Sequence, residues 1–332
     1  MHLSPEWQLL LACASANSSR EDVYRLVQAC HAMDLDWDHL AETACQHGIA
    51  PLVYHHLQSV GATESLAPSA RDTLQNFSYR NAVRNALLYK DLQAILMALQ
   101  AIQVEVIVLK GAALAEMVYH HRSLRPMGDV DLLVRRQDVS RVEAKLGSVN
   151  YLLSEVTGTK AWYEKYHYHV IFQKHAATPT AIPYEIHWDL ERPRSPFTID
   201  IAGLWERAVP ASIAHVEALV LCPEDLLLHL CLHTCQDNFS CGLRSLCDIS
   251  ETIRQYGHTI NWEHLQTRSY QWRINRCVYL VLRLTRELLG AAVPDSLLDA
   301  LTPEDLDPRL LAWTQEQILA VRTPAPIPAR VA

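Results

Sequence analysis

Apolar residues recur every three or four positions through most of the first hundred residues, which is the period of an amphipathic helix. The clearest example is the series Leu88, Leu92, Ile95 and Leu99. The polar residues between them fall on the other side of the same helix. The pattern predicts helices throughout 5–100, including one long helix over about 69–100.

The period changes after residue 100. The run 103–109 is rich in β-branched residues and ends at Lys110 and Gly111, so it predicts a buried strand that enters a turn. The residues up to 120 return to a helical composition. The short apolar run 130–134 predicts a second buried strand.

Two further segments, 168–172 and 184–188, alternate between apolar and polar residues and predict a pair of antiparallel strands. The helical pattern then resumes after Pro193. The expected helices are 226–235, 243–256, 261–268, 272–289 and 303–320. We therefore expect an α+β fold with four parts along the chain: an N-terminal helical region over 1–100, an α/β core over 101–192, a C-terminal helical region over 193–322, and a flexible tail over 323–332.

The amino-acid composition excludes several classes of function. The chain has 332 residues and only ten glycines, no two of them closer than Gly147 and Gly158, which excludes the common Gly-rich phosphate loops. A net charge of −8 argues against extended nucleic-acid binding, although a local basic pocket stays open. Nine scattered cysteines without a Cys-x-x-Cys pair predict reduced thiols and a cytoplasmic protein. No apolar run approaches 18 residues, so we expect no membrane association.

The strongest chemical signal is the pair Asp129 and Asp131. Side chains on a strand alternate between its faces, so these two carboxylates share one face at roughly 6 to 7 Å along the chain. Such a pair repels unless a cation lies between the two groups, and hard oxygen ligands suit Mg²⁺. The alternative is two solvated acids at a strand end. The apolar neighbours of the pair favour metal binding.

The sequence also resembles a known family, the uncharacterised nucleotidyltransferase-like group of the DNA polymerase β nucleotidyltransferase superfamily. The resemblance rests on two motifs that occur in order, Val108-Leu109-Lys110-Gly111-Ala112-Ala113-Leu114 and Leu124-Arg125-Pro126-Met127-Gly128-Asp129-Val130-Asp131-Leu132-Leu133-Val134. Flanking blocks of the same group match around residues 47–52, 80–81, 185–188 and 223–233, so the resemblance covers most of the chain.

The resemblance implies a nucleotidyltransferase-type mixed sheet in which Gly111 belongs to a turn before a helix. It makes Asp129 and Asp131 the first metal ligands and Glu185 the third carboxylate, holding one or two Mg²⁺ ions that Mn²⁺ can replace. The implied reaction moves a nucleoside monophosphate from a nucleoside triphosphate to an acceptor hydroxyl. The acceptor, a small molecule, a peptide or a protein, is not identified by the resemblance.

The turn departs from the superfamily pattern, which pairs the glycine with a serine that contacts the phosphates; here Ala112 follows Gly111. Lys110 and Arg125 are the candidate replacements as phosphate contacts, one as a point charge and the other as a bidentate fork. Two alternatives therefore remain: a non-catalytic nucleotide-binding or protein-interaction module on the same fold, and transfer or hydrolysis on a phosphorylated or sugar-linked substrate.

Several histidines and one acid lie near these motifs. His187 and Asp189 share the strand face of Glu185, so either could extend the site, although residues of this kind more often lie at a strand edge. His229 and His233, with Cys231 and Cys235 nearby, have a spacing found in metal sites. On so apolar a helix, the usual alternative is a buried histidine with a hydrogen-bond partner, and His233 could instead face the active cleft.

Overall fold

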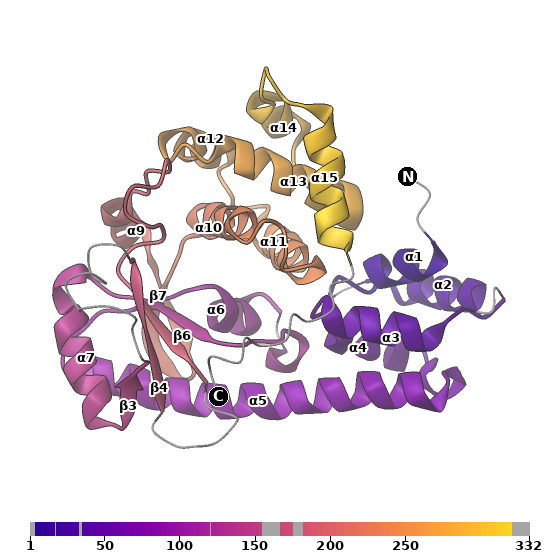
Figure 1. The fold of residues 1–332 in the computed structure, drawn as a ribbon, viewed down its shortest axis with the longest axis horizontal. Helices are drawn as coiled ribbons and strands as arrows, with labels where there is room; N and C mark the ends of the chain where they lie inside the picture. The colour runs from indigo at the N-terminus through magenta and orange to yellow at the C-terminus, as the bar shows by residue number, and fades with distance from the viewer. Residues whose placement is uncertain are drawn as a thin grey trace.

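The N-terminal hundred residues are helical, as their apolar spacing predicts. The computed structural model describes residues 4–16, 18–32, 35–119, 121–154, 167–174 and 182–320. Its first elements are α1 (Pro5–Ala12), α2 (Arg20–Ala32), α3 (Trp37–Gln46), α4 (Ala50–Ser59), the 3₁₀ turn η1 (Thr63–Ser65) and α5 (Pro68–Gln100). The long helix α5 runs along the base of the molecule in Figure 1, with α3 and α4 packed on its N-terminal half.

In the described part of the chain, seven strands form one mixed sheet in the order β3-β4-β5-β2-β1-β7-β6. The strands are β1 (Ile107–Val108), β2 (Val130–Leu133), β3 (Tyr151–Leu153), β4 (His169–Lys174), β5 (Tyr184–His187), β6 (Val209–Ile213) and β7 (Val216–Val220). The pairs β2·β5 and β1·β7 are parallel, and the remaining neighbours are antiparallel. The expected antiparallel pairing of 168–172 with 184–188 is confirmed in β4·β5.

The two faces of the sheet pack against different layers. Val108 and Leu132 belong to the apolar cluster that contains Leu92 and Leu96 of α5. Ile107 and Leu133, on the opposite face, belong to the cluster that contains residues of the C-terminal helices, such as Leu227 and Leu246, together with residues of the N-terminal helices. Residues of β2 and β5 that alternate with the α5-facing positions therefore point toward the C-terminal helices.

The remaining helices cover the sheet and build the C-terminal region (Figure 1). They are α6 (Lys110–Met117), α7 (Val139–Ser148), α9 (Ile201–Arg207), α10 (Pro223–Gln236), α11 (Leu243–Tyr256), α12 (Trp262–Gln271), α13 (Asn275–Leu289), α14 (Asp295–Leu301) and α15 (Pro308–Leu319), with the 3₁₀ turns η2 (Arg122–Leu124) and η3 (Arg136–Asp138). The chain is thus an α+β protein with helical regions on both sides of a mixed sheet. Among the described residues, no helix combines the length and the apolar character needed to cross a membrane.

Several elements differ from the sequence expectation. The hairpin β6–β7 lies within a region expected to be helical, although in β6 the apolar residues Val209, Ala211 and Ile213 do alternate with Pro210 and Ser212. Proline is tolerated there because β6 is an edge strand. The strand expected over 103–109 is only the two residues of β1, and α14 was not expected. The tail 323–332 lies outside the described residues, and the division of the chain into four parts stays a prediction.

Candidate active site

Three carboxylates come together on the sheet face that looks toward the C-terminal helices. Asp131 of β2 is the direct register partner of Glu185 on the parallel strand β5. Asp129 precedes β2 by one residue and shares the face of Asp131. All three line one cavity of about 600 Å³, so the structure places the predicted acids in one site.

Asp131 is the centre of the polar contacts in this cavity. Its side chain is only 4% exposed, and its Oδ1 accepts hydrogen bonds from Lys110 Nζ at 3.1 Å and from His187 Nε2 at 3.0 Å. Burial acts to raise the pKa of Asp131, but the Lys110 charge and the His187 hydrogen bond hold that pKa well below its usual range. Asp131 is therefore ionised at neutral pH.

Asp129 is in the opposite electrostatic situation. Burial, followed by the negative charge of Asp131, raises the pKa of Asp129 above its usual value. Lys110 opposes this shift but does not reverse it. The pKa values of these two aspartates thus shift in opposite directions, because Asp131 has close cationic partners and Asp129 is mainly near like charges.

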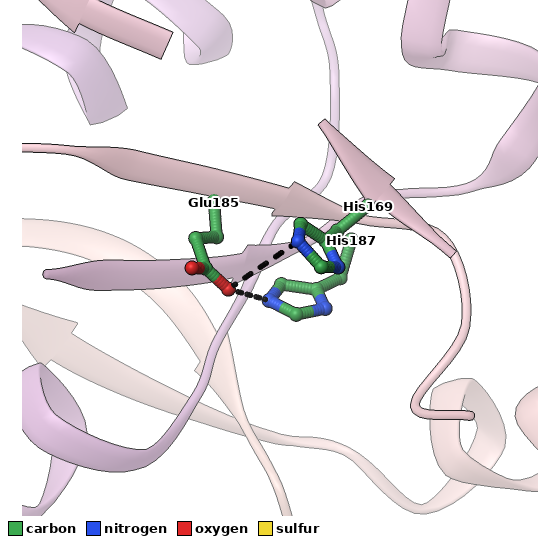
Figure 2. Close-up of side chains that lie close together, drawn as sticks. All are labelled: His169, Glu185 and His187. Carbon is green, nitrogen blue, oxygen red and sulfur yellow. Dashed lines mark ion pairs between the residues drawn. The ribbon is translucent and has the colours of Figure 1, made fainter. Parts of the chain in front are cut away.

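Glu185 lies beside two imidazole rings, and Figure 2 shows both rings turned toward its carboxylate. The distances from Glu185 Oε2 are 3.3 Å to His187 Nε2 and 3.9 Å to His169 Nε2. Burial raises the pKa of Glu185, but the His187 hydrogen bond leaves that pKa below its usual value. Burial lowers the pKa of His187, yet its hydrogen bonds to Asp131 and Glu185 leave it raised overall, whereas burial and the nearby His187 lower the pKa of His169 to about 4.

The structure distinguishes two residues near Glu185 that the sequence pattern treats alike. His187 is not an edge residue; it is 4% exposed and lies inside the cavity. Asp189 accepts backbone hydrogen bonds from Leu190 and Glu191 at 2.7 and 3.2 Å, so it stabilises the turn after β5. His169 was missed, although the predicted antiparallel pairing would have placed it opposite His187, its register partner.

Gly111 and Arg125 meet at the rim of the cavity. Gly111 lies in the first turn of α6, and a Cβ atom there would come within 2.7 Å of Arg125 Nη1. Arg125 Nε and Nη2 donate to the two carboxylate oxygens of Asp248 at 2.8 and 2.7 Å, and Tyr119 donates to the same carboxylate at 2.9 Å. Two of the guanidinium nitrogens are therefore held by α11, which leaves Nη1 as the nitrogen nearest Gly111.

Helix α10 forms the opposite wall of the cavity with His229 and His233. His229 is 4% exposed, and neither of its ring nitrogens has a hydrogen-bond partner among the described residues. Burial and then the Lys110 charge lower the pKa of His229 well below its usual value, so this ring is neutral. Its orientation toward the site is a tertiary feature that the sequence pattern left open.

The metal-like grouping of His229 and His233 with Cys231 and Cys235 does not form. Cys231 is fully buried in the apolar core, and Cys235 interacts with Cys277. His233 Nε2 lies 3.4 Å from Asp237 Oδ2, and Cys241 Sγ donates to the same oxygen at 2.7 Å. His233, Asp237 and Cys241 are thus a second compact group of possible metal ligands, on the helical wall of the same cavity.

Comparison with known proteins identifies the family of this chain. The sequence model of the family described as uncharacterised nucleotidyltransferase matches residues 33–290, so the chain belongs to that family and to the nucleotidyltransferase class. One similar solved structure is an antigenic nucleotidyltransferase-like protein from Paracoccidioides brasiliensis. It is 14% identical, with a TM-score of 0.38 over 64% of this chain and 95% of that chain. No curated protein matches the chain.

Proposed function

We propose that the protein is a metal-dependent enzyme that transfers a nucleoside monophosphate from a nucleoside triphosphate to an acceptor hydroxyl. The observation that carries this proposal is the convergence of Asp129, Asp131 and Glu185 on one sheet face of a single cavity. Family membership supports nucleotidyl transfer as the reaction class. The dependence on a metal, the nucleoside triphosphate donor and the acceptor hydroxyl are part of this proposal.

The three carboxylates suit a divalent cation. Their oxygens are hard ligands of the type that Mg²⁺ and Mn²⁺ accept, and the raised pKa of Asp129 reflects a burial of negative charge that a cation would relieve. We propose that Asp129, Asp131 and Glu185 hold one or two such ions. Bound there, the ions would supply charge neutralisation for the triphosphate and for the attacking and leaving oxygens.

The phosphates would be bound at the N-terminus of α6. The N–H groups in the first turn of a helix have no acceptor within the helix, and the N-cap residue Leu109 provides no side-chain cap. Lys110 begins the helix and lines the cavity, so its ammonium can supply the charge where Ala112 lacks a hydroxyl. Arg125 can add its Nη1, because Nε and Nη2 already donate to Asp248.

Glu185 is suited to assist deprotonation of the acceptor. The hydrogen bond from His187 opposes the effect of burial and keeps the pKa of Glu185 below its usual value, so its carboxylate is ionised at neutral pH. It faces the cavity from the strand next to Asp131. A hydroxyl bound between them would be within reach of a general base.

Nucleotide titration tests the donor half of the proposal. Lys110→Ala should weaken binding of a nucleoside triphosphate more than binding of the monophosphate, because an ammonium at the helix start acts chiefly on the outer phosphates. A charge-assisted contact is worth about 1.5 to 3 kcal/mol, or roughly 10- to 150-fold in affinity. Lys90→Ala on α5 is the matched control, because Lys90 is exposed and does not line the cavity.

Pyrophosphate release with candidate acceptors tests the chemical half. Nucleotide binding without pyrophosphate release for any acceptor class would favour the non-catalytic module, which the substitution of Ala112 for the usual serine already makes the second candidate. Equal losses of triphosphate and monophosphate binding in Lys110→Ala would place the lysine in a structural role. No binding of any nucleotide, with Mg²⁺ or Mn²⁺ present, would overturn the proposed function.

A further inference from the structure

A carboxylate site for Mg²⁺ needs no imidazole, yet two imidazoles line this one. His169 and His187 contact the carboxylate proposed as the third metal ligand, and each presents Nε2 to the same oxygen of Glu185 (Figure 2). The three residues form a compact group in which every possible ligand atom lies within 4.8 Å of the others.

The sheet register brings these groups together. His169 of β4 and His187 of β5 are direct partners in the antiparallel pair β4·β5, and their ring centroids are 4.9 Å apart. Glu185 lies two residues before His187 on β5, so it shares the same face. Asp131, the register partner of Glu185, adds an oxygen from β2. Three adjacent strands therefore contribute two nitrogens and two oxygens to the same part of the cavity.

The distances fit a small metal ion. Metal–nitrogen and metal–oxygen bonds of about 2.0 to 2.2 Å in a tetrahedral site place neighbouring ligand atoms about 3.3 to 3.6 Å apart. His187 Nε2 lies 3.3 Å from Glu185 Oε2 and 3.0 Å from Asp131 Oδ1, and His169 Nε2 lies 3.9 Å from Glu185 Oε2. His169, His187 and Glu185 therefore offer three ligand atoms to one ion, and Asp131 Oδ1 lies next to His187 Nε2.

The burial and the charge of these side chains also suit a bound metal ion. The side chains of His187 and His169 are 5% and 16% exposed, so their rings are enclosed and do not simply extend into solvent. Asp131 and Glu185 supply two negative charges, whereas Lys110 is the cation in direct contact with Asp131.

We propose that His169, His187 and Glu185, with Asp131, bind one divalent transition-metal ion in preference to Mg²⁺. Imidazole nitrogen favours ions such as Zn²⁺, Co²⁺ and Fe²⁺, whereas Mg²⁺ binds mainly to oxygen. This inference rests on the proposed function, because it identifies the ion of the same cavity. It predicts that the enzyme is selective for metals with nitrogen affinity.

Co²⁺ is the probe, because its visible absorption changes with ligand type and reports binding without turnover. Chelator-treated protein titrated with Co²⁺ should bind it and should keep it in about a hundredfold excess of Mg²⁺. Loss of an outer-shell partner of a metal ligand already costs about 10- to 100-fold in affinity, so losing a direct ligand through His169→Gln should cost at least about tenfold. The spectrum should change in the same variant.

Two further variants make the test decisive. His187→Gln should behave like His169→Gln if it folds, which circular dichroism checks; the less buried His169 decides the matter if it does not. His233→Gln tests the other group of possible ligands, because this histidine lines the opposite wall of the same cavity with Asp237 and Cys241. Its Co²⁺ affinity should stay at the wild-type value.

The outcomes separate this inference from the proposed function. Unchanged Co²⁺ affinity in both strand variants, with loss in Asp131→Asn, would show that carboxylates alone hold the ion; the imidazole site would be overturned and the proposed function retained. Loss in His233→Gln but not in His169→Gln would place the ion on His233, Asp237 and Cys241 and would also overturn the inference. Displacement of Co²⁺ by Mg²⁺ at a similar concentration would also overturn the inference. Absence of any Co²⁺ or Mg²⁺ binding would overturn both proposals.

Discussion

Replacing Asp129 or Asp131 by asparagine should change stability in opposite directions, although the two residues share one strand face. Considered as two neighbouring acids, either substitution relieves repulsion and should hold or raise stability. The structure reverses this expectation for Asp131, because its carboxylate is the buried acceptor of Lys110 and His187. For Asp129, in contrast, burial and the negative charge of Asp131 destabilise the ionised carboxylate.

The magnitude follows from the contacts. Hydrogen bonds to a charged group contribute about 1.5 to 3 kcal/mol each, so Asp131→Asn weakens two such bonds. Relief of repulsion from Asp129 and Glu185 offsets part of this loss, and the asparagine oxygen still accepts a weaker bond. We expect Asp131→Asn to lower the free energy of unfolding by about 1 to 3 kcal/mol and Asp129→Asn to raise it by up to about 1 kcal/mol.

Urea unfolding at pH 7 in the presence of a chelator measures both changes without a contribution from bound metal. Because the folded-state pKa of Asp131 is depressed, its contribution is present above the ordinary carboxyl pKa and is lost as the pH falls toward the folded value. The difference between the wild type and Asp131→Asn should therefore shrink on acidification. Asp131→Asn with wild-type or higher stability at pH 7 would refute the reasoning, because repulsion would then outweigh the two bonds.

Three further predictions concern the surroundings of the site and are measured by urea unfolding. Gly111→Ala should cost about 1 to 3 kcal/mol, because its Cβ would clash with the fixed Arg125, whereas Gly128→Ala meets nothing within 4 Å and should cost far less. Arg125→Lys should lower stability by about 1 to 3 kcal/mol, since lysine cannot form the bidentate pair with Asp248; an unchanged value would make that pair irrelevant to folding. Burial lowers the pKa of His47 from 6.5 to about 4, so the unfolded state binds the extra proton and stability should fall by up to about 3 kcal/mol as the pH drops through that window. His47→Gln should show a shallower decline, and an identical pH profile would contradict this assignment.

Local periodicity accounts for much of the fold. The helical repeat predicted α5 within a residue or two of its bounds, Pro68–Gln100, and the alternation of two segments predicted the pairing of β4 with β5. These features depend on residues a few positions apart, so their physical cause lies within the segment itself. The β6–β7 hairpin was missed, because β7 is fixed by its parallel pairing with β1, more than a hundred residues earlier.

The candidate site likewise combines features that the sequence predicts with features that only the tertiary structure shows. The period of two placed Asp129 and Asp131 on one face, and the resemblance supplied Glu185, whose register with Asp131 only the structure shows. No local pattern could pair Arg125 with Asp248, which lies 123 residues away, or place His229 of α10 against the acids of the sheet. The sequence by itself therefore determined which residue types carry the chemistry. Their charge states and partners were decided by the tertiary structure, because burial and Coulomb interactions depend on distances in space and not on spacing along the chain.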